Sequence, residues 1–329
     1  MSLRRRVMHT LHELGVGRRL HARNRAAGRI PIVVFHRVTP VADPFWPPYT
    51  PEQFRRIVAF LAEHYRFLNV EYLFTKPIDQ LRDGIVLTFD DAWADFLHYA
   101  LPVLEEFRAP VTQFLATAPL DEGRIIWTSE VDAAFRYATV PEVVLEDGAT
   151  RLVLPLSTEA ERLAAAVRFR NHILSLPNER TFAAVEQLHA RLGRPTAPDQ
   201  RLLTWEELRN LRERVHFGAH TVTHSSLRFA AAGPWLTHEL EHCATRIATE
   251  LGTRPRYLAY PIGFQNAAVR AEAAKHYEAA FAVGGTPADL HLLQNDPDYR
   301  FRIPRINLTD VEPAEVWLRI NGFHAALGR

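Results

Sequence analysis

The stretch Gly84-Ile85-Val86-Leu87-Thr88-Phe89-Asp90-Asp91 is the most informative part of this 329-residue sequence. Its first six residues are mostly apolar and β-branched, which is typical of a buried strand in a parallel sheet. The two aspartates stand where this strand should end, and ligand sites in α/β folds collect at the carboxyl ends of strands. A single Asp there would be interpreted as a helix cap. A cap needs only one Asp, so the pair predicts a functional site.

A second motif, His220-Thr221-Val222-Thr223-His224, follows another short predicted strand over residues 215–219. One carboxylate and two imidazoles can hold a divalent ion, and a second carboxylate is then free to act as a base. The alternative is a pair of solvated loop histidines. The spacing alone is weak evidence, because His238 and His242 share it and lie off the apolar stripe of a predicted helix. The strand-end position is what favours a metal site at the first pair.

Together the two motifs resemble those of the NodB-homology polysaccharide deacetylases, carbohydrate esterase family four. Other segments agree in order along the chain: Val34–Val38, Pro110–Thr117, Leu258–Gly263 and Ile303–Ile306. The resemblance covers roughly residues 30–320. Each motif alone is a modest signal, but the motifs together in this order are specific to the family. It implies an α/β fold, a distorted (β/α) barrel of about seven strands. It also implies a metal-dependent hydrolase that removes N-acetyl groups from an amino sugar of a polysaccharide or glycan precursor.

Carried over residue by residue, the resemblance implies that Asp91, His220 and His224 bind the metal ion. Zn²⁺ is the first choice, with Mn²⁺, Co²⁺ or Ni²⁺ as alternatives. Asp90 would be the general base. The segment Tyr260-Pro261-Ile262 would line the substrate groove, with the backbone N–H of Ile262 helping to hold the oxyanion.

The sequence departs from the family pattern at three points. Ala259 and Ile262 stand where the motif carries an arginine and a tyrosine. The arginine orients the base, and Arg305, after a strand predicted at residues 301–303, is its candidate replacement. A late Leu-x-His that supplies the acid is also absent. His36, at the end of the first predicted strand, is the candidate acid, and a buried structural role is an equal alternative for it. His291 is a weaker candidate.

Residues 1–29 contain eight arginines against one glutamate, and apolar residues recur there at helical spacing. This pattern predicts a basic amphipathic helix, which either lies on an anionic membrane surface or docks on the barrel with solvated arginines. The deacetylase-like barrel itself is expected over residues 30–322.

The two metal motifs lie further apart than in compact members of the family, and residues 121–200 are therefore expected to form an insertion at the top of the barrel. An insertion there could select the substrate or bind a partner subunit. Trp127 is its candidate for sugar stacking, with simple packing as the alternative. Pro40–Pro51, rich in proline and aromatic residues, must be irregular. This loop either covers a sugar ring or packs the barrel rim.

The composition excludes several classes of protein. A net charge of +1 argues against a broad nucleic-acid surface. No apolar region follows the basic start, so no secretory signal is expected, and no run approaches the length of a membrane span. The single Cys243 falls on an apolar helix stripe and fits a reducing compartment. The sequence therefore predicts a cytoplasmic protein, with its N-terminal helix as a potential contact with the inner face of the membrane.

Two other functions stay open at this stage. One is a deformylase or deacylase of a small or lipid-linked sugar, favoured by the basic start and the lack of an export signal. The other is a non-enzymatic glycan-binding member, which damage to the catalytic set would favour. Asp90, Asp91, His220 and His224 are all present. Release of acetate or formate from candidate sugars would separate the three functions.

Overall fold

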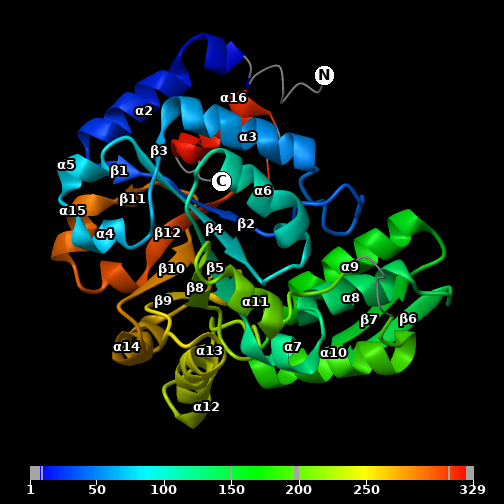
Figure 1. Ribbon diagram of the computed structural model, residues 1–329. Coiled ribbons are helices and arrows are strands. Elements are labelled where there is room, and N and C mark those ends of the chain that lie inside the picture. Colours follow the sequence, from blue (N-terminus) through cyan, green and yellow to red (C-terminus); the bar gives the residue numbers. More distant parts are fainter. Residues whose placement is uncertain (1–7, 9, 149, 196–199, 310–311, 324–329) are drawn as a thin grey trace.

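A computed structural model describes residues 8, 10–148, 150–195, 200–309 and 312–323. Seven parallel strands form its centre: β2 (Ile32–Phe35), β4 (Gly84–Asp90), β5 (Val111–Leu115), β8 (His216–Ala219), β9 (Tyr257–Ala259), β10 (Ala279–Val283) and β12 (Ile303–Asn307). Their order is β2-β12-β10-β9-β8-β5-β4, and β4 pairs again with β2, which closes the barrel. A short β3 (Arg66–Phe67) pairs with β4 from outside. The expected barrel is confirmed (Figure 1).

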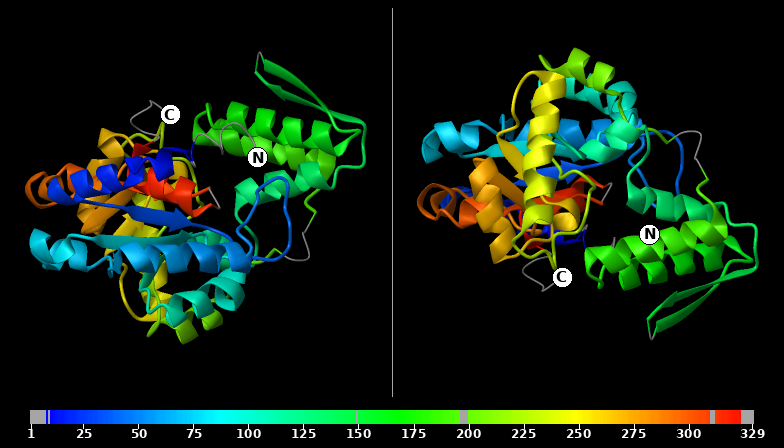
Figure 2. Two further views of the ribbon diagram at one scale, coloured as in Figure 1. Left: turned by 90° about the horizontal axis from the view of Figure 1, so that it is seen from above. Right: turned by 90° about the horizontal axis from the view of Figure 1, so that it is seen from below.

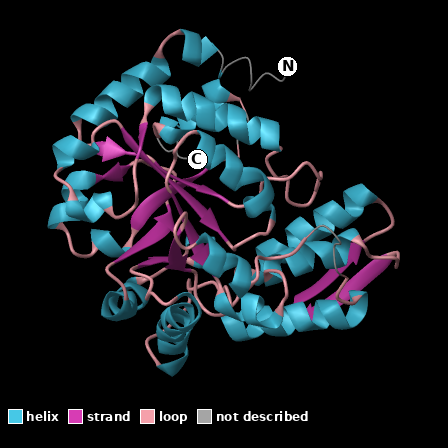
Figure 3. Ribbon diagram, viewed as in Figure 1, coloured by secondary structure: helices cyan, strands magenta, loops and turns pink. Residues whose placement is uncertain are grey.

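Helices surround this barrel, and Figure 3 shows the strands at the centre of the ring. They are α3 (Pro51–His64), α4 (Tyr72–Thr75), α5 (Ile78–Leu81), η1 (Phe96–Ala100), α6 (Leu101–Glu106), α7 (Thr117–Glu122), α11 (Trp205–Leu211), α12 (Pro234–Thr237), η2 (His238–His242), α13 (Cys243–Leu251), η3 (Pro261–Gly263), α14 (Ala267–His276), α15 (Leu290–Asn295), η4 (Tyr299–Phe301) and α16 (Pro313–Ile320).

Local sequence explains how these elements begin. Thr50 and Gln53 form a capping box at the start of α3, each side chain bonded to the other's backbone N–H. Thr204 and Glu207 do the same for α11. All seven residues of β4 are buried, as its continuous apolar run predicts.

One predicted strand is misplaced. Residues 301–303 were expected to be extended, but Phe301 ends the 3₁₀ turn η4 and the strand β12 runs from Ile303 to Asn307. Pro304 normally disfavours a central strand because it lacks an N–H. The ladder continues past it, with Phe281, Ala282 and Val283 of β10 in register with Ile303, Pro304 and Arg305. Arg305 therefore lies inside a barrel strand rather than after one.

The segment between the metal motifs builds a core of its own beside the barrel (Figure 2). It contains α8 (Trp127–Arg136), the hairpin β6 (Glu142–Asp147) and β7 (Thr150–Pro155), and the helices α9 (Glu159–Ile173) and α10 (Asn178–Leu192). One face of the hairpin is buried, with Val143 and Leu145 of β6 opposite Leu154 and Leu152 of β7. The insertion contacts the barrel at the loop that carries His224, through a hydrogen bond from α8.

The basic helix α2 (Val16–Ala26) docks on the barrel. Gly17 lies so close to α16 that a Cβ there would stand 1.9 Å from Cδ1 of Trp317. Asn24 donates a hydrogen bond to the backbone oxygen of Asn321 (3.2 Å). After α2, the two-residue strands β1 (Arg29–Ile30) and β11 (Ala288–Asp289) pair antiparallel. One face of α2 is thus covered, and membrane contact through residues 1–29 stays a prediction.

Residues 1–7 and 9 of that segment lie outside the described part of the chain. Among the residues described, no helix is both long enough and apolar enough to cross a bilayer.

Candidate active site

Three predicted metal ligands converge at one end of the barrel. Asp91 directly follows β4, and His220 directly follows β8. The Asp91 Oδ1 atom lies 3.4 Å from Nε2 of His224 and 3.7 Å from Nε2 of His220. One ligand atom from each of the three side chains can be chosen so that all lie within 4.8 Å of one another. Three ligand atoms this close together could be shared by one ion.

The state of these side chains fits a divalent ion. His220 Nδ1 lies 2.7 Å from the backbone oxygen of Ala259, so Nδ1 carries the proton and the lone pair of Nε2 faces Asp91. Burial lowers the pKa of both His220 and His224 to about 4, which keeps the imidazoles neutral and able to bind metal. Asp91 Oδ1 is buried with no hydrogen-bond partner among the described residues. A cation would supply that partner.

Asp90 is held differently from its neighbour. Both its oxygens accept hydrogen bonds from Arg305, each at 2.7 Å, in a bidentate pair. Burial alone would raise the pKa of Asp90, but the charge and the hydrogen bonds of Arg305 outweigh burial and place that pKa well below its usual range. Asp90 is therefore an ionised carboxylate, and its Oδ2 lies 3.7 Å from Nε2 of His220.

Arg305 reaches Asp90 through the inside of the barrel. Its strand β12 pairs with β2, and β2 pairs with β4, so the guanidinium spans one intervening strand. The side chain is 0% exposed and also donates to Oγ1 of Thr88 at 3.2 Å. Because Ala259 replaces the motif arginine, Arg305 was the candidate partner of Asp90. The structure brings these two side chains together.

Unusual backbone conformations gather around these residues. Among the described non-glycine residues, seven have a positive φ, and five of them lie in the loops at this barrel end: Asp91 (75°), Ala92 (59°), Thr221 (66°), His224 (58°) and Ile262 (60°). L-residues seldom adopt this left-handed conformation, and such strain concentrates at functional sites.

A family model for polysaccharide deacetylases matches residues 79–279, more than half of the chain. The chain belongs to the polysaccharide deacetylase family. Members of this family are hydrolases that act on amide bonds other than peptide bonds, and they generally depend on a metal. The matched region contains both motifs that form the site, which supports deacetylation of a polysaccharide as the activity. No curated protein sequence is a significant match.

Solved structures of deacetylases share the fold. The Streptococcus pyogenes deacetylase PplD in complex with acetate is 17% identical, with a TM-score of 0.58 over 89% of this chain and 98% of that one. IcaB from Ammonifex degensii is 13% identical, with a TM-score of 0.55 over 89% and 97%. The de-N-acetylase from Aggregatibacter actinomycetemcomitans is 15% identical, with a TM-score of 0.53 over 88% and 100%. At these identities the likeness concerns the barrel architecture.

The acid candidate His36 stands at the same mouth of the barrel. It follows the last residue of β2 and is half-buried. Burial raises the pKa of Asp91, and interaction with His36 opposes that rise, which indicates that His36 lies near the candidate metal ligands. His291 does not: it is exposed on α15, beside Gly28 near the start of β1. His291 is therefore no longer a candidate for the general acid.

Two residues expected to face the sugar are buried instead. The Trp127 ring is 7% exposed in the core of the insertion, edge-on to Phe182 at 5.8 Å between ring centroids. Its Nε1–H donates to the backbone oxygen of His224 (2.9 Å), so the structure favours packing over stacking. Tyr260 is 0% exposed, and its hydroxyl donates to the backbone oxygen of Phe301 (2.9 Å). Its ring cannot line a groove, which leaves the turn at Pro261 and Ile262 for that role.

Sequence reasoning missed a supporting carboxylate, Glu239 on η2. It is 1% exposed, and its Oε2 accepts hydrogen bonds from the backbone N–H groups of Val222 (3.1 Å) and Thr223 (3.0 Å). Its Oε1 accepts from the Thr223 hydroxyl at 2.8 Å. Glu239 thus fixes the loop between the two candidate metal-binding histidines. Leu240 lies on the apolar stripe of this helix. A carboxylate directly next to Leu240 was the signal that could have indicated a buried role for Glu239.

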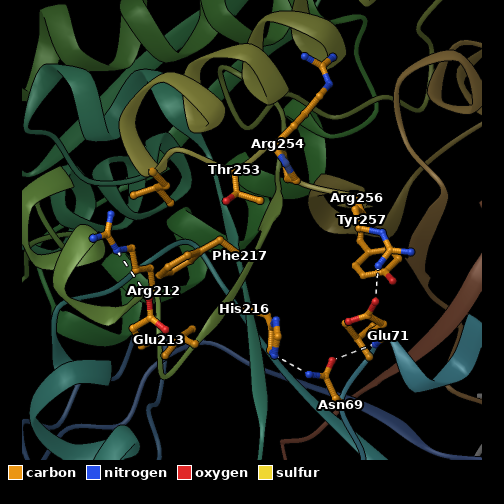
Figure 4. Close-up of a pocket in the computed structure, with 14 residues that line it drawn as sticks. Asn69, Glu71, Arg212, Glu213, His216, Phe217, Thr253, Arg254, Arg256 and Tyr257 are labelled. Carbon is orange, nitrogen blue, oxygen red and sulfur yellow. Dashed lines mark hydrogen bonds and ion pairs between the residues drawn. The ribbon is translucent and has the colours of Figure 1, made fainter. Parts of the chain in front are cut away.

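A separate cleft of about 230 Å³ opens at the opposite end of the barrel (Figure 4). His216 begins β8 and Tyr257 begins β9, so their side chains lie at the amino ends of the strands. Polar groups there pair with each other: Arg256 with Glu71 at 2.5 Å, and Asn69 with His216. This cleft is remote from the carboxyl ends of the strands, where the candidate catalytic groups lie.

Proposed function

We propose that this protein removes N-acetyl groups from an amino sugar of a polysaccharide or glycan precursor, using a divalent ion held by Asp91, His220 and His224. The observation that carries this proposal is the pairing of two unlike carboxylates at one barrel mouth. Asp91 faces two neutral imidazoles, while Asp90 is held ionised by Arg305. Such a division of environment is how enzymes separate a ligand from a base.

Two neutral imidazoles and one carboxylate suit Zn²⁺, and the same ligand set accepts Mn²⁺, Co²⁺ or Ni²⁺. When bound, a divalent ion supplies Lewis acidity, which polarises a carbonyl oxygen and makes water more acidic. The protein's own groups supply the rest. Asp90 takes a proton from the attacking water, and Arg305 keeps the carboxylate in one orientation.

The remaining steps use the rim of the mouth. The backbone N–H of Ile262, in its left-handed turn, stabilises the negative oxygen that forms when water adds to the acyl carbon. His36 then protonates the nitrogen as the carbon–nitrogen bond breaks, which releases a carboxylate and a free amino sugar. Acetate is held by the similar Streptococcus deacetylase, and it is the acid that this reaction would release.

The test is product release. Purified protein loaded with Zn²⁺ is incubated with N-acetylated and N-formylated glucosamine oligosaccharides, and acetate and formate are measured separately. We expect acetate, with loss of turnover in the Asp90→Asn variant. Formate alone would identify a deformylase, and release of neither acid from metal-loaded protein would contradict the proposal.

A further inference from the structure

The outer face of α2 is a positively charged surface that the chemistry above does not use. Its members are exposed and recur at the three- and four-residue spacing of one helix face: Arg18, Arg19, Ala22, Arg23 and Ala26. The opposite face is covered, since Gly17 and Asn24 are buried against α16 and Asn321. Figure 1 shows α2 along the outside of the molecule. The side of α2 that faces solvent therefore carries three guanidinium groups.

Barrel carboxylates neutralise the arginines near the end of α2 but not those on its outer face. Arg25 Nε lies 3.0 Å from Asp83, and Arg29 Nε lies 3.1 Å from Asp289. No ion pair among the described residues includes the three arginines of the outer face. Their charge is thus available to a partner outside the chain.

The fold itself gains nothing from two of these charges. The helix α2 begins at Val16, so Arg18 and Arg19 stand in its first turn, which has no acidic residue. The backbone N–H groups at this end make it the positive pole of the helix, and cations there are unfavourable. Gly15, the N-cap, offers no side chain to accept from those N–H groups. An anionic surface against this end would offset both the arginine charges and the helix dipole.

The residues around this face indicate which kind of anionic partner it fits. Leu14, directly before the helix cap, is 64% exposed. A lipid bilayer offers an anionic layer of phosphates with an apolar layer beneath it, which suits arginines flanked by an exposed leucine. Residues 10–29 contain no Phe, Tyr or Trp, the side chains on which the bases of a nucleic acid stack. An acidic glycan has no apolar layer for Leu14. The face therefore matches a bilayer best.

We propose that the outer face of α2 is a docking surface for an anionic lipid bilayer, with the three arginines on lipid phosphates and Leu14 at the level of the headgroups. The helix binds as folded, because its other face stays on the barrel. It therefore adheres mainly by charge and does not bury an apolar face as an inserted amphipathic helix does. Such attraction is screened by salt. The proposal is independent of the deacetylase chemistry, since α2 carries none of the candidate catalytic groups.

The test is co-sedimentation of the full-length protein with sucrose-loaded vesicles. One set is phosphatidylcholine alone, and the other contains about a third of phosphatidylglycerol, an anionic lipid. We expect binding to the anionic set only, lost at about 1 M salt, where the screening length is about 3 Å. The variant Arg18→Gln/Arg19→Gln/Arg23→Gln should lower the partition coefficient about 100-fold, the size expected for three arginines near a membrane. The variant Arg18→Lys/Arg19→Lys/Arg23→Lys should bind nearly as the parent does, and Leu14→Ser should lower binding several-fold.

The matched control has the same loss of charge far from α2: Arg191→Gln/Arg212→Gln/Arg254→Gln, at exposed positions on α10 and just after α11 and α13. It should bind as the parent does, and far-UV circular dichroism should show that every variant is folded. Equal binding to both vesicle sets, or an equal loss in the control and the α2 variant, would overturn the proposal. Binding to anionic vesicles that survives the α2 variant would overturn it too. Retention on heparin that needs the three arginines, with vesicle binding unaffected by Leu14→Ser, would assign the face to a soluble polyanion instead.

Discussion

Asp90 and Asp91 are neighbours in the chain but have opposite electrostatic surroundings. Asp90 points into the barrel, where Arg305 neutralises it with two hydrogen bonds. Asp91, with a left-handed backbone, points to the imidazoles of His220 and His224. Two adjacent carboxylates in a dry site would repel each other if they shared one environment. The structure avoids this by giving one a fixed guanidinium and the other a place for a cation.

Substitution of Asp90 and substitution of Asp91 should therefore have different effects on turnover and on metal binding. Asp90→Asn should leave Zn²⁺ binding nearly intact and lower turnover by roughly 10²-fold or more, the usual scale for a lost general base. Asp91→Asn should weaken Zn²⁺ binding itself. Metal content after dialysis and kcat for acetate release measure the two effects. Equal loss of metal in both variants would show that the roles are wrongly divided.

At the scale of the elements, two segments brace the histidine loop from outside the barrel sheet. Trp127 on α8 bonds to the backbone oxygen of His224, and Glu239 bonds to the backbone of Val222 and Thr223. Glu239 lies in η2, a π-helical turn between α12 and α13, and such turns are frequent at functional sites. The insertion and the helix thus hold the candidate metal ligands in place from behind.

Glu239→Gln should weaken metal binding although Glu239 is not among the proposed ligands. An amide has one acceptor oxygen, so one of the loop N–H groups or the Thr223 hydroxyl loses its partner. Outer supports of this kind typically contribute about 10–100-fold in metal affinity, and we expect a loss in that range from competition with a Zn²⁺ chelator. Glu241→Gln, exposed on the same turn, is the control. Unchanged affinity in Glu239→Gln would remove its supporting role.

For the whole molecule, the same buried imidazoles link stability to pH. In the metal-free protein, burial lowers the pKa of His220 and His224 from 6.5 to about 4. Between these two values the unfolded chain binds more protons than the folded chain does. The free energy of unfolding is therefore highest above pH 6.5 and falls as the pH drops toward 4. At a pH of about 5 each histidine should cost about 2 kcal/mol.

Urea denaturation of chelator-treated protein measures this loss as the difference in the free energy of unfolding between about pH 7 and about pH 5. The His220→Gln variant should lose less stability over the same interval, because one of the two buried groups no longer titrates. His238→Gln, at an exposed position, should behave as the parent protein does. An identical pH dependence in the parent and in His220→Gln would contradict the expectation. Adding Zn²⁺ at neutral pH should raise the unfolding midpoint, since the ion should bind the folded site more tightly than the unfolded chain.

The sequence by itself determined the strands β4 and β8 and the polar residues at their carboxyl ends. Apolar runs predicted β4 and β8, and parallel strands of one barrel place their carboxyl ends at one mouth, so Asp90–Asp91 and His220–His224 had to lie near each other. Capping boxes at Thr50 and Thr204 likewise mark helix starts within a few residues of sequence. These are local patterns, readable within a few residues, and the family resemblance rested on the same short motifs.

Only the tertiary structure decided which distant side chains complete the site. Arg305 became a candidate because the motif arginine is missing at Ala259. Its bond to Asp90, 215 positions away in the sequence, depends on the barrel placing only β2 between β12 and β4. The burial of Trp127 and Tyr260 and the reach of Glu239 depend likewise on how the insertion and η2 pack. Sequence spacing encodes periodicity along one element. It does not encode the contacts between elements, which arise when the whole chain excludes water from its core.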